Sequence, residues 1–191
     1  WRFHRLAVRP LLILEQGSSS VSGCAPPLGM VSVTLRDAAG NELATGTAAS
    51  GPDGRFAIEL AEAGGAPAPV RKGDVADFVA PGGTAPVEAE ELWLHRQADG
   101  SFKGGGVPDR DVALVFELAG GGRNRASLRT GSEGEFSFSR LDLPAAADWS
   151  PETAQRAWAY MALAGDHFTV VAAVAASTWL PEPCSRSSIP R

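Results

Sequence analysis

The stretch Val31-Ser32-Val33-Thr34-Leu35 alternates apolar and polar side chains, and so does Arg55-Phe56-Ala57-Ile58-Glu59-Leu60 after the tight loop Gly51-Pro52-Asp53-Gly54. Alternation with a period of two is typical of strands that bury one face. The turn residues between the stretches favour antiparallel neighbours. The sequence therefore predicts an antiparallel β layer.

The same pattern returns in the second half of the chain. Val112-Ala113-Leu114-Val115-Phe116 comes first, and the loop Gly131-Ser132-Glu133-Gly134 and the strand Glu135-Phe136-Ser137-Phe138 follow it. Gly54 and Gly134 lie 80 residues apart. This spacing suits one small β domain per repeat rather than a solenoid. We therefore predict an all-β chain with a duplicated β-sandwich.

The composition is that of an ordinary globular protein. The chain has 191 residues, of which 44% are hydrophobic, and a net charge of −5. This length allows one large domain or two small ones, and the repeat favours two. The acidic charge gives no field that attracts phosphate backbones, so we expect no nucleic acid partner. The longest apolar run, residues 168–176, is strand-length, so we expect no membrane span.

Four parts are predicted along the chain. Residues 1–20 form an N-terminal extension strand and linker, 21–86 the first module, 87–180 the second module and 181–191 a tail. The order of residues at the start differs from that of a signal peptide, so we expect any targeting segment to have been removed already.

One short helix is predicted, within residues 148–156. Ser150 is a suitable N-cap, Pro151 suits the first helical position, and Glu152 places an acid in the first turn. The alternating residues 157–171 then predict a terminal hairpin.

The first module resembles a known family in its turn chemistry. The motifs are Val-x-Gly-x-Ala-Pro-Pro (residues 21–27), Val-Thr-Leu-Arg-Asp-x-x-Gly-Asn (33–41), Gly-x-x-Gly-Arg-Phe (51–56) and Lys-Gly-Asp-Val (72–75). The module is similar to bacterial extracellular Ig-like and carboxypeptidase-regulatory-like modules, which resemble collagen-binding B-type repeats. The resemblance covers residues 21–80 well and 107–175 loosely. It implies two Ig-like or transthyretin-like sandwiches, an extracellular location, and a role in stalks, spacers, adhesion domains or surface assemblies.

The flank before the first repeat is the most apolar part of the chain, with Pro10 in its middle. We interpret it either as an edge strand of its own domain or as a strand donated to a neighbouring copy by β-augmentation. Gly17-Ser18-Ser19-Ser20 would serve as the joint in both cases. The second interpretation makes copies of this chain its partners. The candidate intersubunit contacts are Leu6, Val8, Leu12 and Leu14.

The chain has two cysteines, Cys24 and Cys184, near the opposite ends of the folded region. A bridge between them would close a loop of about 160 residues and would stabilise the fold by roughly 4 to 5 kcal/mol in the chain-entropy model. The alternatives are this disulfide, which suits an extracellular protein, and two free thiols, which suit a cytosolic one.

No motif in the sequence carries catalytic or metal chemistry. The three histidines lie far apart, and no Gly-x-Ser-x-Gly accompanies them. The loop acids lack a calcium-loop series, and the histidines and cysteines lack zinc-ligand spacing. The glycine triplets 104–106 and 120–122 indicate flexible turns rather than phosphate cradles. We therefore expect no catalytic residue, no metal and no cofactor.

Aromatic rings offer one binding chemistry. Trp93 and Trp149 are candidates for stacking on sugars, although core packing uses the same residue type. The sequence thus predicts a non-enzymatic structural subunit of an extracellular surface assembly, such as a filament, a layer or an adhesive stalk. The alternative is a carbohydrate-binding or adhesin module with surface glycans as partners.

Overall fold

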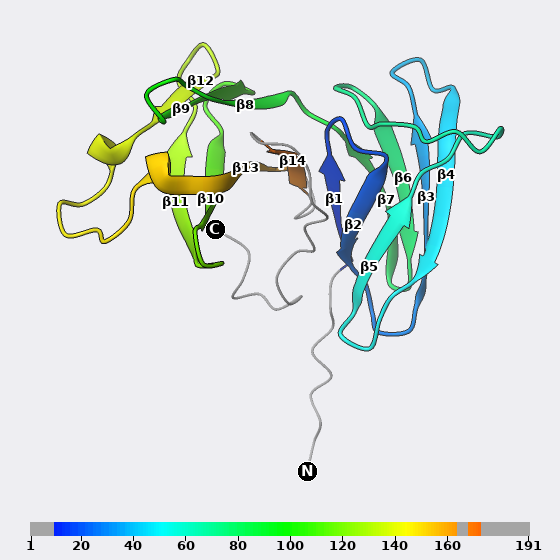
Figure 1. Cartoon of the computed structure of the whole chain (residues 1–191). Helices are drawn as coiled ribbons and strands as arrows, with labels where there is room; N and C mark the ends of the chain where they lie inside the picture. Colours follow the sequence, from blue (N-terminus) through cyan, green and yellow to red (C-terminus); the bar gives the residue numbers. More distant parts are fainter. Residues whose placement is uncertain (1–9, 164–167, 173–191) are drawn as a thin grey trace. The chain divides into compact units, whose positions relative to one another are not determined.

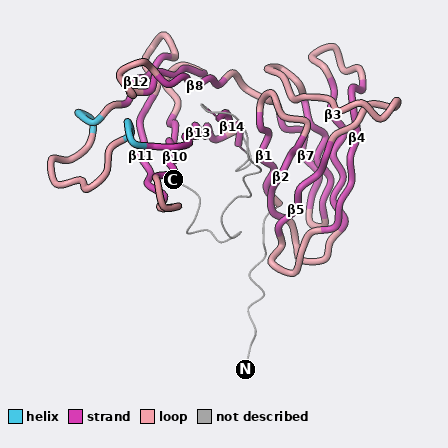
Figure 2. The backbone as a smooth tube through the Cα atoms, viewed as in Figure 1, coloured by secondary structure: helices cyan, strands magenta, loops and turns pink. Residues whose placement is uncertain are grey.

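The structure is a computed structural model that describes residues 10–163 and 168–172. These residues form fourteen β-strands and two three-residue 3-10 turns, and Figure 2 shows how strongly the strands dominate. The chain divides into two compact units, whose described residues are 10–89 in the first and 90–163 with 168–172 in the second. The prediction of an all-β fold is confirmed.

The first unit has two antiparallel sheets, whose strands are labelled in Figure 1. One sheet has the order β1-β2-β5 and consists of β1 (Leu11–Glu15), β2 (Ser20–Cys24) and β5 (Arg55–Glu59). The other has the order β4-β3-β6-β7 and consists of β3 (Met30–Arg36), β4 (Glu42–Ala49), β6 (Val75–Ala80) and β7 (Gly83–Glu88).

The second unit has the same division into a small and a large sheet. The small sheet has the order β12-β9-β8 and consists of β8 (Leu92–Arg96), β9 (Phe102–Gly106) and β12 (Glu135–Phe138). The large sheet has the order β11-β10-β13-β14 and consists of β10 (Asp111–Leu118), β11 (Arg123–Arg129), β13 (Ala154–Ala162) and β14 (Phe168–Ala172).

The second unit repeats the first strand for strand. Each strand has its counterpart seven strands later, at the same place in the corresponding sheet. The three-stranded sheets are β1-β2-β5 and β8-β9-β12, and the four-stranded sheets are β4-β3-β6-β7 and β11-β10-β13-β14. The repeated pattern in the sequence therefore corresponds to a repeated strand order.

Alternating side chains build the core of the first unit. Val33 and Leu35 of β3 are buried, and Thr34 between them is partly exposed. Phe56 of β5 stacks on Phe78 of β6 with ring centroids 5.8 Å apart. Because β5 and β6 belong to different sheets, this ring pair joins the two layers of a sandwich.

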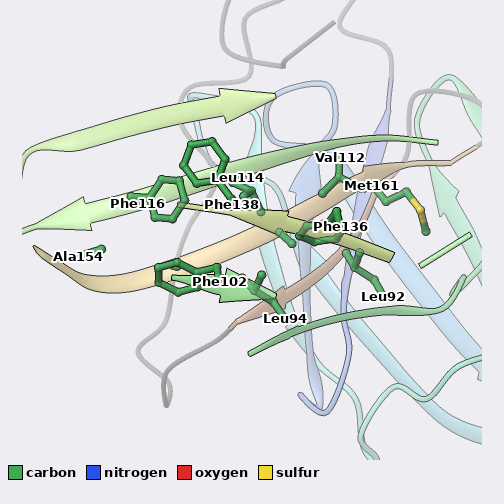
Figure 3. Close-up of a cluster of buried hydrophobic side chains, with 12 residues drawn as sticks. Leu92, Leu94, Phe102, Val112, Leu114, Phe116, Phe136, Phe138, Ala154 and Met161 are labelled. Carbon is green, nitrogen blue, oxygen red and sulfur yellow. The ribbon is translucent and has the colours of Figure 1, made fainter. Parts of the chain in front are cut away.

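The core of the second unit is a cluster of buried side chains from both of its sheets, drawn in Figure 3. Phe116 of β10 contacts Phe102 of β9 and Phe138 of β12, with ring centroids 5.3 and 5.4 Å away. The buried members are Leu92, Leu94, Phe102, Val112, Leu114, Phe116, Phe136, Phe138, Ala154, Ala157, Ala159 and Met161.

One expectation about local structure was wrong, and another was not confirmed in full. The short helix expected within residues 148–156 is reduced to one 3-10 turn at Pro151–Thr153, which passes directly into β13, the partner of β10. The glycine triplet at 104–106 lies within strand β9 instead of a turn. The predicted terminal hairpin is confirmed by the pairing of β13 with β14. Among the described residues no helix is long and apolar enough to cross a membrane.

Candidate functional site

The apolar N-terminal stripe lies partly within the sheet of its own unit. Leu12 and Leu14 on β1 are fully buried and pair with Gly23 and Val21 of β2. A Cβ added at Gly23 would lie 2.8 Å from the ring of Phe56, so this face of the sheet points into the core of the sandwich. Within one chain, Leu12 and Leu14 are therefore core residues.

Several candidate residues fall outside the part of the chain that the structure describes. Leu6 and Val8 precede residue 10, and Cys184 follows residue 172. Cys24 ends β2 and is buried. The disulfide between Cys24 and Cys184 stays a prediction.

The structure separates the two candidate tryptophans. Trp149 packs against Phe116 and Phe138 of the buried cluster, with ring centroids 5.3 and 6.5 Å away. Trp93 lies between Leu92 and Leu94, which are buried in that cluster, so strand alternation turns Trp93 to the outer face of the small sheet. Trp149 thus serves the core, and Trp93 belongs to a surface.

That surface is the outer face of β8-β9-β12, which we call the tryptophan face. The ring of Trp93 lies 5.4 Å from the ring of His95, two residues along β8. Alternation and the register of the three strands define the members of the face, which are Trp93, His95, Lys103, Gly105, Glu135 and Ser137.

The loop acids serve the turns in which they lie. Backbone N–H groups donate to each carboxylate, from Ala39 to Asp37 (2.9 Å), from Arg55 to Asp53 (3.1 Å), from Arg71 to Asp74 (2.7 Å) and from Ser101 to Asp99 (2.9 Å). Hydrogen bonds from the side chain and backbone of Asn41 hold the pKa of Asp37 below its ordinary value. Within residues 10–163 and 168–172, no group of three or more His, Cys, Asp or Glu residues could hold a metal ion.

Each unit has a buried hydroxyl that hydrogen-bonds a turn, and neither hydroxyl was predicted from the sequence. The N–H of Gly29 donates to Ser50 Oγ (3.0 Å), which donates to the carbonyl of Pro26 (2.6 Å). In the second unit the N–H of Arg110 donates to Thr130 Oγ1 (2.9 Å), which donates to the carbonyl of Val107 (2.7 Å). Both hydroxyl residues are only 2% exposed. We call this arrangement the hydroxyl latch.

Each hydroxyl latch holds a turn that requires an unusual backbone conformation. Leu28 has a φ of 59° and Asp109 a φ of 55°. Both angles lie in the left-handed region, which residues other than glycine rarely adopt. Both residues lie in the latched turns before β3 and β10. Ser50 and Thr130 each directly precede a Gly-x-x-Gly loop. That repeated pair was the signal in the sequence that could have revealed the latch.

Removing the latch hydroxyl is expected to destabilise each unit. In Thr130→Val the N–H of Arg110 and the carbonyl of Val107 lose this part-buried hydroxyl. In Ser50→Ala the N–H of Gly29 and the carbonyl of Pro26 lose the hydroxyl but keep their hydrogen bond to each other (3.2 Å). Each change should therefore cost about 1 to 2 kcal/mol of the free energy of unfolding. Urea unfolding measures the loss. The exposed Thr47→Ala is the control, with an expected change within about 0.5 kcal/mol. Equal curves for Ser50→Ala and Thr47→Ala would contradict a structural role for the latch.

The comparisons with known proteins add a structural likeness but no family. No family model and no curated protein matches the sequence. Among solved structures, the chain is similar to a tetra-tandem repeat in the extending region of a large adhesion protein, with 16% identity and a TM-score of 0.29. The match covers 86% of this chain and 48% of the other, so this chain spans about half the length of that structure.

Proposed function

We propose that the chain is a non-enzymatic structural part of an extracellular surface assembly, such as a filament, a layer or an adhesive stalk. The observation that carries this proposal is the repetition of one seven-strand sandwich, with the strand order and the hydroxyl latch both kept. Each repeat has its own hydrophobic core, as expected of a structural module that is repeated along a chain.

The finer part of the proposal is that copies assemble through strand β1. Leu12 and Leu14 fill the core of their own unit, and β1 of a second copy would make the same contacts if the strand were exchanged between chains. Leu6 and Val8 precede them with the same alternation. The contacts exist already in one chain, so exchange needs no new complementary surface.

The joint after β1 would have to open for this exchange. Gly17 has a φ of 82°, and a Cβ added there would meet no atom within 4 Å. Its N–H donates to the carbonyl of Val70 (2.9 Å), and the N–H of Ser18 donates to the carbonyl of Glu15 (3.1 Å). The N–H of Val70 also donates to the carbonyl of Ser18 (2.9 Å), so exchange requires these backbone hydrogen bonds to break before β1 leaves one chain and enters another.

The assembly mode is tested with a chain that begins at Ser18 and therefore lacks β1. We expect this chain to lose the assembled mass of the full chain in light scattering, and we expect a synthetic peptide of residues 5–17 to bind it. A peptide with Leu12→Asp and Leu14→Asp is the control, since both charges would enter a core. If the shortened chain assembled like the full chain, β1 would not be the contact.

A further inference from the structure

The tryptophan face has a flat aromatic platform. A Cβ added at Gly105 would lie 2.6, 2.7 and 2.8 Å from Nε1, Cε2 and Cζ2 of Trp93. Three ring atoms this close show that the indole packs against the glycine and occupies the space that a side chain there would need. Gly105 is buried and Trp93 is half-buried, so the indole covers this glycine while part of the side chain stays exposed.

A charged pair lies next to this platform. Lys103 Nζ is 3.1 Å from Glu135 Oε2, and the two side chains are 48% and 58% exposed. Trp93 pairs with Gly105, which pairs with Glu135, so the indole and the carboxylate share one row across the three strands. Neighbouring strands are about 4.8 Å apart, which leaves about 10 Å between the outer two backbones.

The position of Trp93 is explained in part by its packing on Gly105, which has no side chain of its own. Gly104, the neighbour of Gly105, is covered on the opposite face by Phe136, whose Cζ lies 2.2 Å from an added Cβ. A phenylalanine ring is therefore sufficient to cover a glycine in this strand. The outer ring is instead an indole with an N–H donor, beside an exposed ammonium and an exposed carboxylate.

These groups together match the chemistry of a sugar ring. The C–H face of a pyranose is apolar and packs on a flat aromatic ring, while its hydroxyls need both donors and acceptors. Lys103 supplies a donor and Glu135 an acceptor at the edge of the platform. We infer that the tryptophan face binds a pyranose unit of a neutral polysaccharide, stacked on Trp93 with its hydroxyls on Lys103 and Glu135. This binding is a function beyond the structural role.

The inference is tested by isothermal titration of the full chain. The probes are hexasaccharides of β-1,4-linked glucose, N-acetylglucosamine and mannose. At least one should bind, and Trp93→Ala should weaken its affinity about tenfold or more. Lys103→Gln and Glu135→Gln should weaken it several-fold at an unchanged melting temperature, because an exposed ion pair contributes little to stability.

Trp149→Phe is the matched control, because Trp149 packs on the core and keeps an aromatic ring after the change. The affinity of this variant for the hexasaccharide that binds should equal that of the unchanged chain. If Trp93→Ala does not fold, the two exposed-charge variants decide. Absence of binding to all three probes, or unchanged affinity in Lys103→Gln and Glu135→Gln, would overturn the inference. Either result leaves the structural role standing, since assembly is measured separately by mass.

Discussion

Gly134→Ala is expected to destabilise the second unit strongly while the stability of the first unit stays unchanged. Gly134 has a φ of 80°, and an added Cβ would lie 2.2 Å from the carbonyl oxygen of Gly106. That backbone cannot retreat easily, because the N–H of Gly106 donates to the carbonyl of Gly134 (2.9 Å). Left-handed strain costs about 1 to 3 kcal/mol, and the clash adds to it. We expect a total above about 3 kcal/mol, a large part of a domain's stability.

The control for this prediction is Gly121→Ala in the same unit. Gly121 has a φ of 82°, but an added Cβ would meet nothing within 4 Å. This variant carries the backbone strain without the clash and should lose only about 1 kcal/mol. Urea unfolding followed by NMR, with separate amide signals for each unit, measures both variants. Equal losses would show that the close approach of Gly134 to Gly106 does not exist in solution.

Phe116→Ala is expected to cost about 3 to 5 kcal/mol of the free energy of unfolding of the second unit. Phe116 is fully buried at the meeting point of three other aromatic rings, Phe102, Phe138 and Trp149. Replacing it leaves a cavity that rings from three different segments cannot all move to fill. The loss of packing should therefore add to the loss of burial.

The control for the destabilisation by Phe116→Ala is Leu141→Ala, which removes an exposed side chain of the same unit. Leu141 is 94% exposed, so its removal should change the free energy of unfolding by no more than about 0.5 kcal/mol. Differential scanning calorimetry should show the transition of the second unit moving to lower temperature in Phe116→Ala alone. A Phe116→Ala transition that stays within error of that of Leu141→Ala would contradict the aromatic core.

The strands could be predicted because they show alternation in the sequence. Features that depend on contacts between residues far apart in sequence could not be predicted. Val33 and Phe56 could be assigned to buried faces because period-two patterns depend on neighbours in sequence. Gly104 and Gly105 were taken for a turn because glycine disfavours strands, and only the rings of Phe136 and Trp93 across the sheet make the strand acceptable.

The same distinction between local pattern and long-range contact applies to the candidate site residues. Trp93 follows the alternation of its strand, and its outward direction could be predicted from buried Leu92 and Leu94. Trp149 lies outside any strand, and its place in the core depends on Phe116, 33 residues earlier. The hydroxyl latch was missed because Ser50 bonds a turn 21 residues away, which no local pattern records.

The measurement that tests the central claim most directly is electron microscopy combined with light-scattering mass, on the protein isolated from its source without denaturant. A structural part of a surface assembly predicts filaments or sheets and a mass far above the 19.8 kDa of one chain. A uniform monomer of 19.8 kDa at every concentration would contradict the claim.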